Sequence, residues 1–215
     1  MDKRKRSMPL PSWLRRPVAK ALDAIFAQIV VVMPVDVFKP LSHPVTGETF
    51  RCLSADENAY VFEWTVAPGG YVPFEHVHLF QDEIFRVQTG AVRLVSDGKE
   101  VIGKSGDTVT VAKGQKHIAF NHTDEVMNCI VEFRPGLDTE IVMQCFWGLI
   151  LDGDYDRHGT PSIFKMGYFI KGCRALTRPT NIPAAIFESA INLFYLIGTV
   201  LGWKKLYKKY TGLER

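Results

Sequence analysis

The order of apolar and polar positions divides this chain into three zones. Residues 1 to about 35 repeat apolar side chains at helical spacing, on one side formed by Trp13, Leu14, Val18, Leu22, Ile25, Phe26 and Ile29. From 48 to 135 short β-rich runs alternate with turn residues, and beyond that the pattern is helical again. The sequence therefore predicts an amphipathic helix and loop over 1–47, a β-domain over 48–135 and a helical extension over 136–215.

The middle zone contains the strand candidates. Apolar and β-branched residues are enriched in five short runs, which are 61–66, 83–88, 91–95, 108–111 and 127–133. Thr89-Gly90 and Ser96-Asp97-Gly98-Lys99 are typical of hairpin turns between some of these strands. Many short antiparallel strands at regular spacing favour a sandwich, a jelly roll or a barrel. We expect a mainly β fold with flanking helices at both termini.

The last apolar stretch, 184–203, has the length of a membrane-spanning helix, at about 30 Å. Pro183 suits its first turn, and a lysine-rich segment, 204–209, follows it. A polar stripe runs down one side and consists of Glu188, Ser189, Asn192, Thr199, Gly202 and Lys209. This stripe favours a helix that lies on a membrane surface, or that packs on the barrel or on a second subunit of a homodimer, over a true span. These alternatives stay open.

The charge distribution and the cysteines indicate which kinds of partner and which cellular compartment to expect. The net charge is +3, but residues 1–20 carry seven Lys or Arg against one Asp, and residues 203–215 carry five against one Glu. The middle of the chain is therefore acidic, which argues against a nucleic-acid groove across it. The four scattered cysteines show no C-x-x-C pair, and the basic N-terminus lacks an A-x-A cleavage site. We expect a cytoplasmic protein, with membrane association left open.

Four residues of the β-domain have the chemistry of a metal site. His76 and His78 are two positions apart, so both imidazoles project from one face of an extended strand. Glu83 begins the next strand candidate, and His117 lies in a further strand-like segment. Three imidazoles and one carboxylate would suit a single divalent ion of Fe(II), Mn(II), Ni(II), Cu(II) or Zn(II). His43, His122 and His158 are expected in loops or on the surface.

These residues resemble the two sequence motifs of the cupin superfamily. The first motif, G-x5-H-x-H-x4-E-x6-G, is matched at every fixed position by Gly70, His76, His78, Glu83 and Gly90. The second, G-x5-P-x-G-x2-H-x3-N, is matched by Gly106, Gly114, His117 and Asn121, with Ala112 where the family has Pro. The resemblance implies a cupin jelly-roll β-barrel that holds the metal inside one mouth. The departure at Ala112 affects the stiffness of a turn and no metal ligand.

Strand parity predicts the lining of this barrel. If Glu83 faces inward, Phe85 and Val87 do too, while Asp82 and Arg86 face outward. The same counting from His117 places Ala119 and Asn121 inside. Residues near the rim are expected to be Tyr71, Phe74 and Gln81. The pocket drawn in this way is mostly apolar.

The resemblance leaves the reaction open. Four protein ligands on an octahedral ion leave two positions, which similar cupins use for substrate, water or dioxygen. We favour an Fe(II)-dependent oxygenase, of dioxygenase type, acting on a small lipophilic substrate. The alternatives are a non-redox isomerase or lyase that uses the ion as a Lewis acid, and a barrel that binds a small ligand without catalysis. The sequence identifies no general base and no catalytic residue beyond the four metal ligands.

Overall fold

The computed structural model describes residues 33–175 and 177–215. The predicted N-terminal helix falls in residues 1–32, outside the described part. The strands are β1 (Leu41–Ser42), β2 (Glu48–Ala55), β3 (Tyr60–Val66), β4 (His76–His78), β5 (Asp82–Thr89), β6 (Ala91–Ser96), β7 (Lys99–Lys104), β8 (Thr108–Val111), β9 (Lys116–Phe120), β10 (Met127–Arg134) and β11 (Thr177–Pro179). The helices are α2 (Thr139–Leu151), α3 (Ile163–Ile170), α4 (Ala184–Val200) and α5 (Lys204–Thr211).

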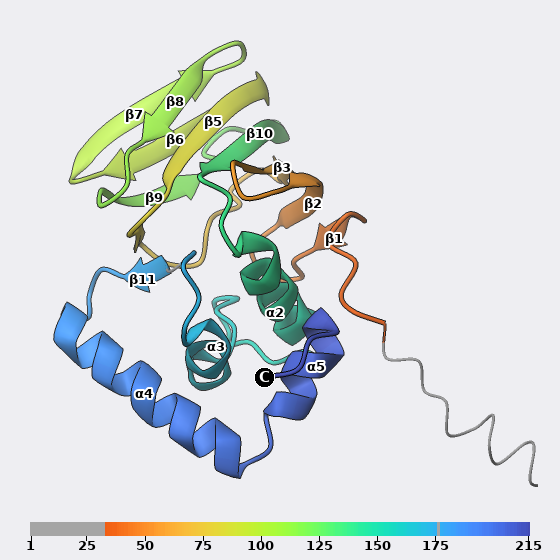
Figure 1. Cartoon of the computed structure of the whole chain (residues 1–215). Helices are drawn as coiled ribbons and strands as arrows, with labels where there is room; N and C mark the ends of the chain where they lie inside the picture. Colours follow the sequence, from red (N-terminus) through yellow and green to blue (C-terminus); the bar gives the residue numbers. More distant parts are fainter. Residues whose placement is uncertain (1–32, 176) are drawn as a thin grey trace, which may run out of the picture. The chain divides into compact units, whose positions relative to one another are not determined.

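Two antiparallel sheets form the β-domain, as the strand pattern predicts (Figure 1). One sheet has the order β1-β2-β3-β10-β5-β8, and the other has the order β11-β4-β9-β6-β7. Their inner faces meet in one core, which includes Phe50, Phe62, Trp64, Phe85 and Val131. This core forms because β3 and β5 alternate buried and less buried residues along their length, so that one face of each strand is apolar. The fold is therefore mainly β.

The two predicted turns differ in their role. Asp97 and Gly98 both have positive φ, of 48° and 77°, and join the hairpin of β6 and β7 as expected. Gly90 does not close a hairpin, because β5 and β6 belong to different sheets. Its φ is 71°, and a Cβ there would lie 3.0 Å from the Met127 Cα. Glycine therefore lets the chain cross from one sheet to the other at a close approach.

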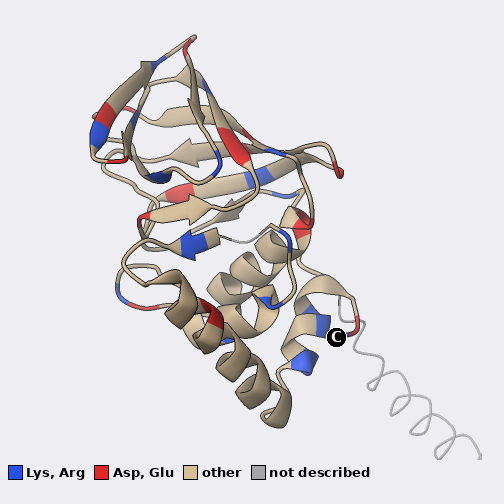
Figure 2. Ribbon diagram, turned by 60° about the vertical axis from the view of Figure 1, so that its left-hand side comes forward, with Lys and Arg blue, Asp and Glu red and all other residues tan. Residues whose placement is uncertain are grey.

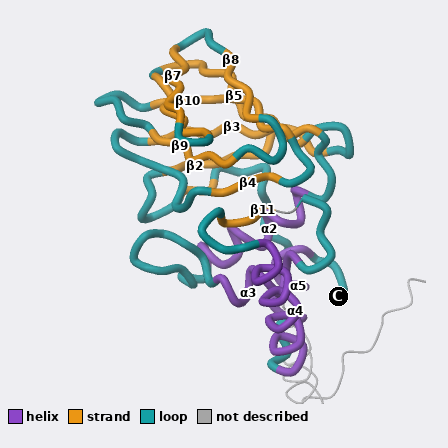
Figure 3. The backbone as a smooth tube through the Cα atoms, turned by 90° about the vertical axis from the view of Figure 1, so that its left-hand side faces the viewer, coloured by secondary structure: helices purple, strands orange, loops and turns teal. Residues whose placement is uncertain are grey.

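The C-terminal region is not entirely helical, which corrects the prediction for 136–215. β11 adds a strand to the second sheet and pairs antiparallel with β4, so that Thr177 lies opposite His78 and Pro179 opposite His76. Periodicity missed β11 because three residues are too short to show alternation. The helices gather at one end of the barrel (Figure 3). The C-terminal segment therefore contributes directly to the barrel end where the histidines lie.

The helices form a second core of their own. Cys145 and Leu149 of α2 contact Tyr168 and Phe169 of α3 and Tyr207 and Tyr210 of α5 in one buried cluster. The Arg215 guanidinium lies over three tyrosine rings, at 4.9 Å from the Tyr207 centroid and 5.4 Å from the Tyr168 centroid. This cluster fixes α2, α3 and α5 against one another.

The predicted helix over 184–203 ends at Val200. A turn at Gly202, with φ of 74°, separates α4 from α5, and the two helices are bent by 95°. Within the described residues no single helix has the length and hydropathy to cross a membrane, and α4 and α5 meet those criteria only as a bent pair.

Candidate metal centre

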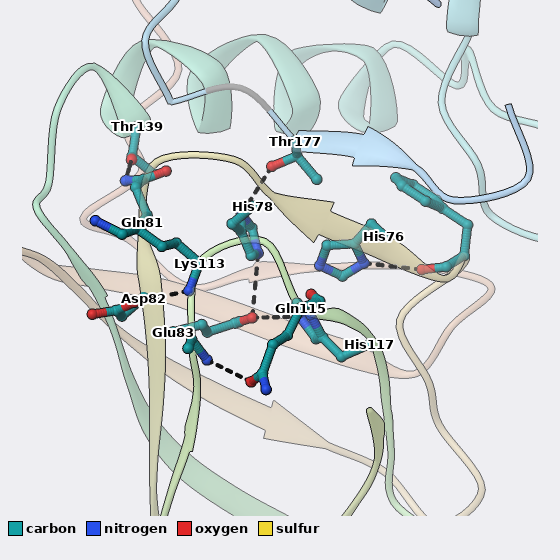
Figure 4. A network of polar contacts seen from close by, with 12 residues as sticks. His76, His78, Gln81, Asp82, Glu83, Lys113, Gln115, His117, Thr139 and Thr177 are labelled. Atoms are coloured by element: carbon teal, nitrogen blue, oxygen red, sulfur yellow. Dashed lines mark hydrogen bonds and ion pairs between the residues drawn. The ribbon is translucent and has the colours of Figure 1, made fainter. Parts of the chain in front are cut away.

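The structure brings the four predicted metal-site residues together inside the barrel (Figure 4). His76 and His78 lie at the two ends of β4 and project from one face, as their spacing predicts. The neighbouring strand β9 places His117 directly opposite His76. β5 of the other sheet carries Glu83 across the interior. The cluster therefore joins the two sheets.

The geometry of this cluster fits a divalent metal ion. One candidate ligand atom from each residue lies within 4.8 Å of those of the other three. The Glu83 Oε2 is 2.6 Å from His117 Nε2 and 3.2 Å from His78 Nε2. All four residues are at most 7% exposed, and the buried His78 Nε2 faces the Glu83 carboxylate without an aligned hydrogen bond in the described structure. A buried nitrogen without a partner is costly unless something binds its lone pair, and a metal ion would do so.

The second nitrogen of each imidazole is held by the surrounding chain. His76 Nδ1 lies 3.0 Å from the Phe74 carbonyl oxygen, and His117 Nδ1 lies 3.3 Å from the Gln115 carbonyl oxygen. The third ring, that of His78, has its Nδ1 3.1 Å from the Thr177 hydroxyl of β11. Hydrogen bonds from Nδ1–H to these oxygens direct every Nε2 into the cluster, where the Nε2 of His117 holds a proton shared with Glu83 until a metal takes its place. The rings are thus oriented as metal ligands are.

The electrostatics agree with this arrangement. Burial, followed by repulsion from His117 and His78, lowers the pKa of His76 to about 3, so that this ring is neutral. Burial alone would raise the pKa of Glu83, but His117 and His78 outweigh it and the pKa is lowered. Burial likewise opposes the charged form of His117, yet Glu83 prevails and raises its pKa. A carboxylate and a neutral imidazole are the forms that bind metals, and an entering ion would displace the proton of His117.

Comparison with known families agrees with the motifs and the site. A family model described as a cupin domain matches residues 62–133, which include all four clustered residues. Residues 62–133 therefore match the cupin domain family. The probable oxidoreductase virH of Hypocrea virens is 25% identical to this chain over 166 residues, 72% of this chain and 74% of that protein.

Solved structures also resemble part of this chain. KdgF from a Halomonas species shares 19% identity, over 44% of this chain and 84% of that one, with a TM-score of 0.41. A sugar phosphate isomerase of the cupin superfamily from Silicibacter pomeroyi shares 22% identity, over 47% and 74%, with a TM-score of 0.42. Because these scores are low, the family assignment rests on the sequence match.

A cavity of about 350 Å³ adjoins the metal residues of the cupin domain. His76, His78 and Glu83 lie in its wall together with inward residues of the barrel, such as Phe50 and Phe85. The helices complete it with apolar side chains, which include Val142, Met143, Phe146, Trp147, Met166, Ile170, Phe187, Ile191 and Phe194. The cavity therefore extends from the barrel interior into the space beneath α2, α3 and α4. Sequence reasoning predicted an apolar pocket but not the helical part of its wall.

Glu48 is an acidic residue in this cavity wall that sequence reasoning missed. Its Oε1 accepts a hydrogen bond of 2.8 Å from Trp64 Nε1, and its Oε2 accepts one of 2.6 Å from the Thr46 hydroxyl. Burial raises the pKa of Glu48 to about 7, although these two hydrogen bonds oppose the rise. Inward parity with Phe50 and Cys52 along β2 was the available signal. Glu48 is a group of the cavity that can exchange a proton near neutral pH.

The predicted inward direction of the strand residues is confirmed, although only Phe85 among them lines the cavity. Phe85, Val87, Ala119 and Asn121 are buried in the interior. On the opposite face of β5, Arg86 pairs with Glu132 at 2.7 Å, and Asp82 accepts a hydrogen bond of 2.8 Å from the Lys113 backbone N–H. Asn121 has a structural role, because its side-chain amide donates to the carbonyl oxygens of Val66, Ala67 and Glu125.

Two expectations about individual residues need correction. Phe74 lines the cavity, but Tyr71 and Gln81 do not. Gln81 is buried and instead donates to the Pro135 carbonyl and the Thr139 hydroxyl, which ties the start of β5 to the start of α2. His43 lies in a loop, as expected. It is buried there, and its Nε2 lies 3.0 Å from the Gly159 carbonyl oxygen. His122 and His158 are exposed, as predicted.

Proposed function

We propose that this cupin is a metal-dependent oxygenase that acts on a small lipophilic substrate. The observation that carries the proposal is the position of three of the four metal-site residues in the wall of a cavity whose other lining is almost entirely apolar. A ligand that fills such a cavity gains free energy mainly by burying apolar surface, at about 25 cal/mol per Å². The name of the relative from Hypocrea virens, a probable oxidoreductase, supports a redox reaction over a non-redox one.

His76, His78, Glu83 and His117 would hold the metal, and we favour Fe(II). Imidazole and carboxylate donors with open positions are the ligand set of non-haem iron oxygenases. When bound, Fe(II) would offer neighbouring positions to dioxygen and to an organic substrate. Mn(II), Ni(II), Cu(II) and Zn(II) suit the same donors. A redox reaction disfavours Zn(II), which does not change its oxidation state, and among the other ions we propose iron.

The chain's own residues would prepare the site for this chemistry. Phe85, Phe133 and Trp147 exclude water from the cavity, which protects reactive species from side reactions. The carbonyl groups of Phe74 and Gln115 and the hydroxyl of Thr177 hold the three rings in place. Glu48, held by Trp64 and Thr46, offers the cavity a carboxyl that binds a polar group of the substrate or exchanges a proton with it.

Oxygen uptake tests the proposal. The metal-free protein is loaded with Fe(II) without oxygen, and a parallel sample is loaded with Zn(II). Oxygen consumption is then measured across a panel of lipophilic phenols, ketones and fatty acids. We expect uptake only with Fe(II) and only with a substrate that fits the cavity. Equal and negligible uptake by both samples across the panel would refute the oxygenase and leave non-redox chemistry or ligand binding.

A further inference from the structure

Helix α4 leaves a large apolar surface exposed on its outer side. The exposed residues of this surface, together with the start of α3, are Ile163, Phe164, Ile186, Leu193, Leu196, Val200 and Leu201. We call them the outer apolar face. Leu196 is 63% exposed and Val200 is 80% exposed. Leu193, Leu196 and Val200 follow one another at three- and four-residue steps and so share one side of α4. Exposed apolar patches on a protein surface often mark interaction sites.

The composition of α4 explains why this face stays exposed. Only Ile191 and Gly198 of the helix are buried, and Glu188 is its only charged residue. The inner side contacts the cavity through Phe187, Ile191 and Phe194. The exposed side also carries Glu188, Ser189, Asn192 and Thr199, so that apolar and polar residues run side by side along it. A helix of this kind suits the boundary between an apolar environment and water.

Positive charge adjoins the outer apolar face at the end of α4. The chain bends by 95° after Leu201 and begins α5 with Lys204 and Lys205, both exposed. Among the described residues neither lysine takes part in an ion pair, whereas Lys208 and Lys209 are paired with Glu214 and Asp152. Figure 2 shows one acidic band on α4 and the basic residues of α5 beyond its end. Exposed apolar residues beside free lysines are complementary to an anionic membrane surface.

The cavity lining continues onto the same face. Ile163 and Ile186 line the cavity and are also members of the outer apolar face, each more than half exposed. We propose that the outer apolar face and Lys204–Lys205 dock this protein on the surface of an anionic lipid bilayer, with the mouth of the cavity toward the lipid. The docking does not depend on the metal or on the reaction. Only the passage of a lipophilic substrate from the bilayer into the cavity rests on the function proposed above.

Vesicle sedimentation of the full-length protein tests the docking. The probes are vesicles of phosphatidylcholine alone and vesicles with one third phosphatidylserine, each at low and at high salt. We expect binding to the anionic vesicles at low salt, weakened by salt, and little binding to the neutral ones. The double variant Leu196→Glu with Val200→Glu should reduce the partition coefficient by at least about tenfold, because charge replaces the buried apolar contact. Lys204→Glu with Lys205→Glu should also reduce the partition coefficient by about tenfold or more, because each lysine near an anionic surface contributes about 1 kcal/mol.

Matched controls lie on the barrel. Val101→Glu with Ile102→Glu changes two exposed apolar residues of β7, and Lys99→Glu with Lys104→Glu makes the same change of net charge there. Both controls should bind like the wild type, and circular dichroism and metal content should be unchanged in all four variants. The docking is overturned if the wild type binds no vesicles, or if the α4 variants bind as well as the barrel controls. It is also overturned if the wild type binds no vesicles but is a dimer by light scattering, and if Leu196→Glu with Val200→Glu dissociates that dimer.

Discussion

The strand walls of the barrel and helix α4 place apolar side chains in opposite ways. β3 and β5 alternate strictly, so that apolar residues fill the interior and Glu63 and Arg86 face outward into ion pairs. α4 has no such division, because apolar residues point both into the cavity and outward. The barrel buries its apolar side chains in a core that positions the metal residues. α4 closes the cavity but depends on a further apolar environment, which we place at the membrane.

The largest effect is expected from a leucine of the barrel core. Leu94 is 1% exposed on β6, and Leu196 is 63% exposed on α4. Leu94→Ala should lower the free energy of unfolding by about 2–5 kcal/mol, because it removes buried surface and leaves a cavity. Leu196→Ala, the same chemical change, should lower it by less than about 0.5 kcal/mol. Urea unfolding of both variants measures the difference, and equal losses would show that α4 is buried in solution.

Glu48 should make stability depend on pH. Its pKa is raised from about 4.5 to about 7 in the folded protein, so the folded state holds a proton that the unfolded state has released. The contribution of Glu48 to the free energy of unfolding is fully present below the pKa of the unfolded state, about 4.5, and is lost as the pH rises to 7. The loss amounts to at most about 3 kcal/mol, at about 1.4 kcal/mol per pH unit.

Glu48→Gln isolates this effect from other titrating groups. The variant keeps an oxygen that can accept from Trp64 but cannot ionise. The free energy of unfolding of wild type minus variant should fall between pH 4.5 and 7 and stay level above pH 7, by urea unfolding at each pH. A difference that is flat across this range would mean that the pKa of Glu48 is the same in the folded and the unfolded protein.

A smaller effect is expected where α4 touches the helical core. A Cβ on Gly198 would lie 2.4 Å from the Tyr168 Cδ2 and 2.5 Å from the Trp203 Cε3. Gly198→Ala should therefore push α4 away and lower the free energy of unfolding by about 1–3 kcal/mol, despite the better helix propensity of alanine. Ser189→Ala, at an exposed position of the same helix, is the control. Faster proteolysis within α4 in the Gly198 variant alone is the expected readout, and identical rates would contradict the contact.

Much of this architecture could be predicted from the sequence. The five strand candidates correspond to β3, β5, β6, β8 and β10 within one residue at each end, because each has a clear apolar pattern. The four metal-site residues were found because H-x-H spacing and the family motif are local in sequence. Thr177, Glu48 and the burial of His43 were missed. The roles of Thr177 and His43 come from contacts between segments far apart in the chain, such as the 99 positions that separate Thr177 from His78. Glu48 was missed because no strand was predicted over 48–55, where β2 lies.

The smallest effect is predicted for Thr177, the contact from β11 to the metal cluster. Thr177→Val removes the oxygen beside His78 Nδ1 while keeping the shape of the side chain. Such partners of a ligating histidine contribute about 10- to 100-fold to metal affinity, and we expect the lower end because one ring is affected. Thr177→Ser should restore the affinity. Competition with a chelator measures it, and an unchanged affinity in the valine variant would separate Thr177 from the metal.

Metal content measured by elemental analysis tests the central claim most directly. The purified wild type, supplied with Fe(II) or Zn(II) and then desalted, should hold about one equivalent of metal, as a mononuclear site requires. Glu83→Ala and His76→Ala should lose most of it, while Glu100→Ala, at an exposed ion pair on β7, should keep it. Metal retained at the wild-type level by both cluster variants, or absent from the folded wild type, would contradict a metal centre in this barrel.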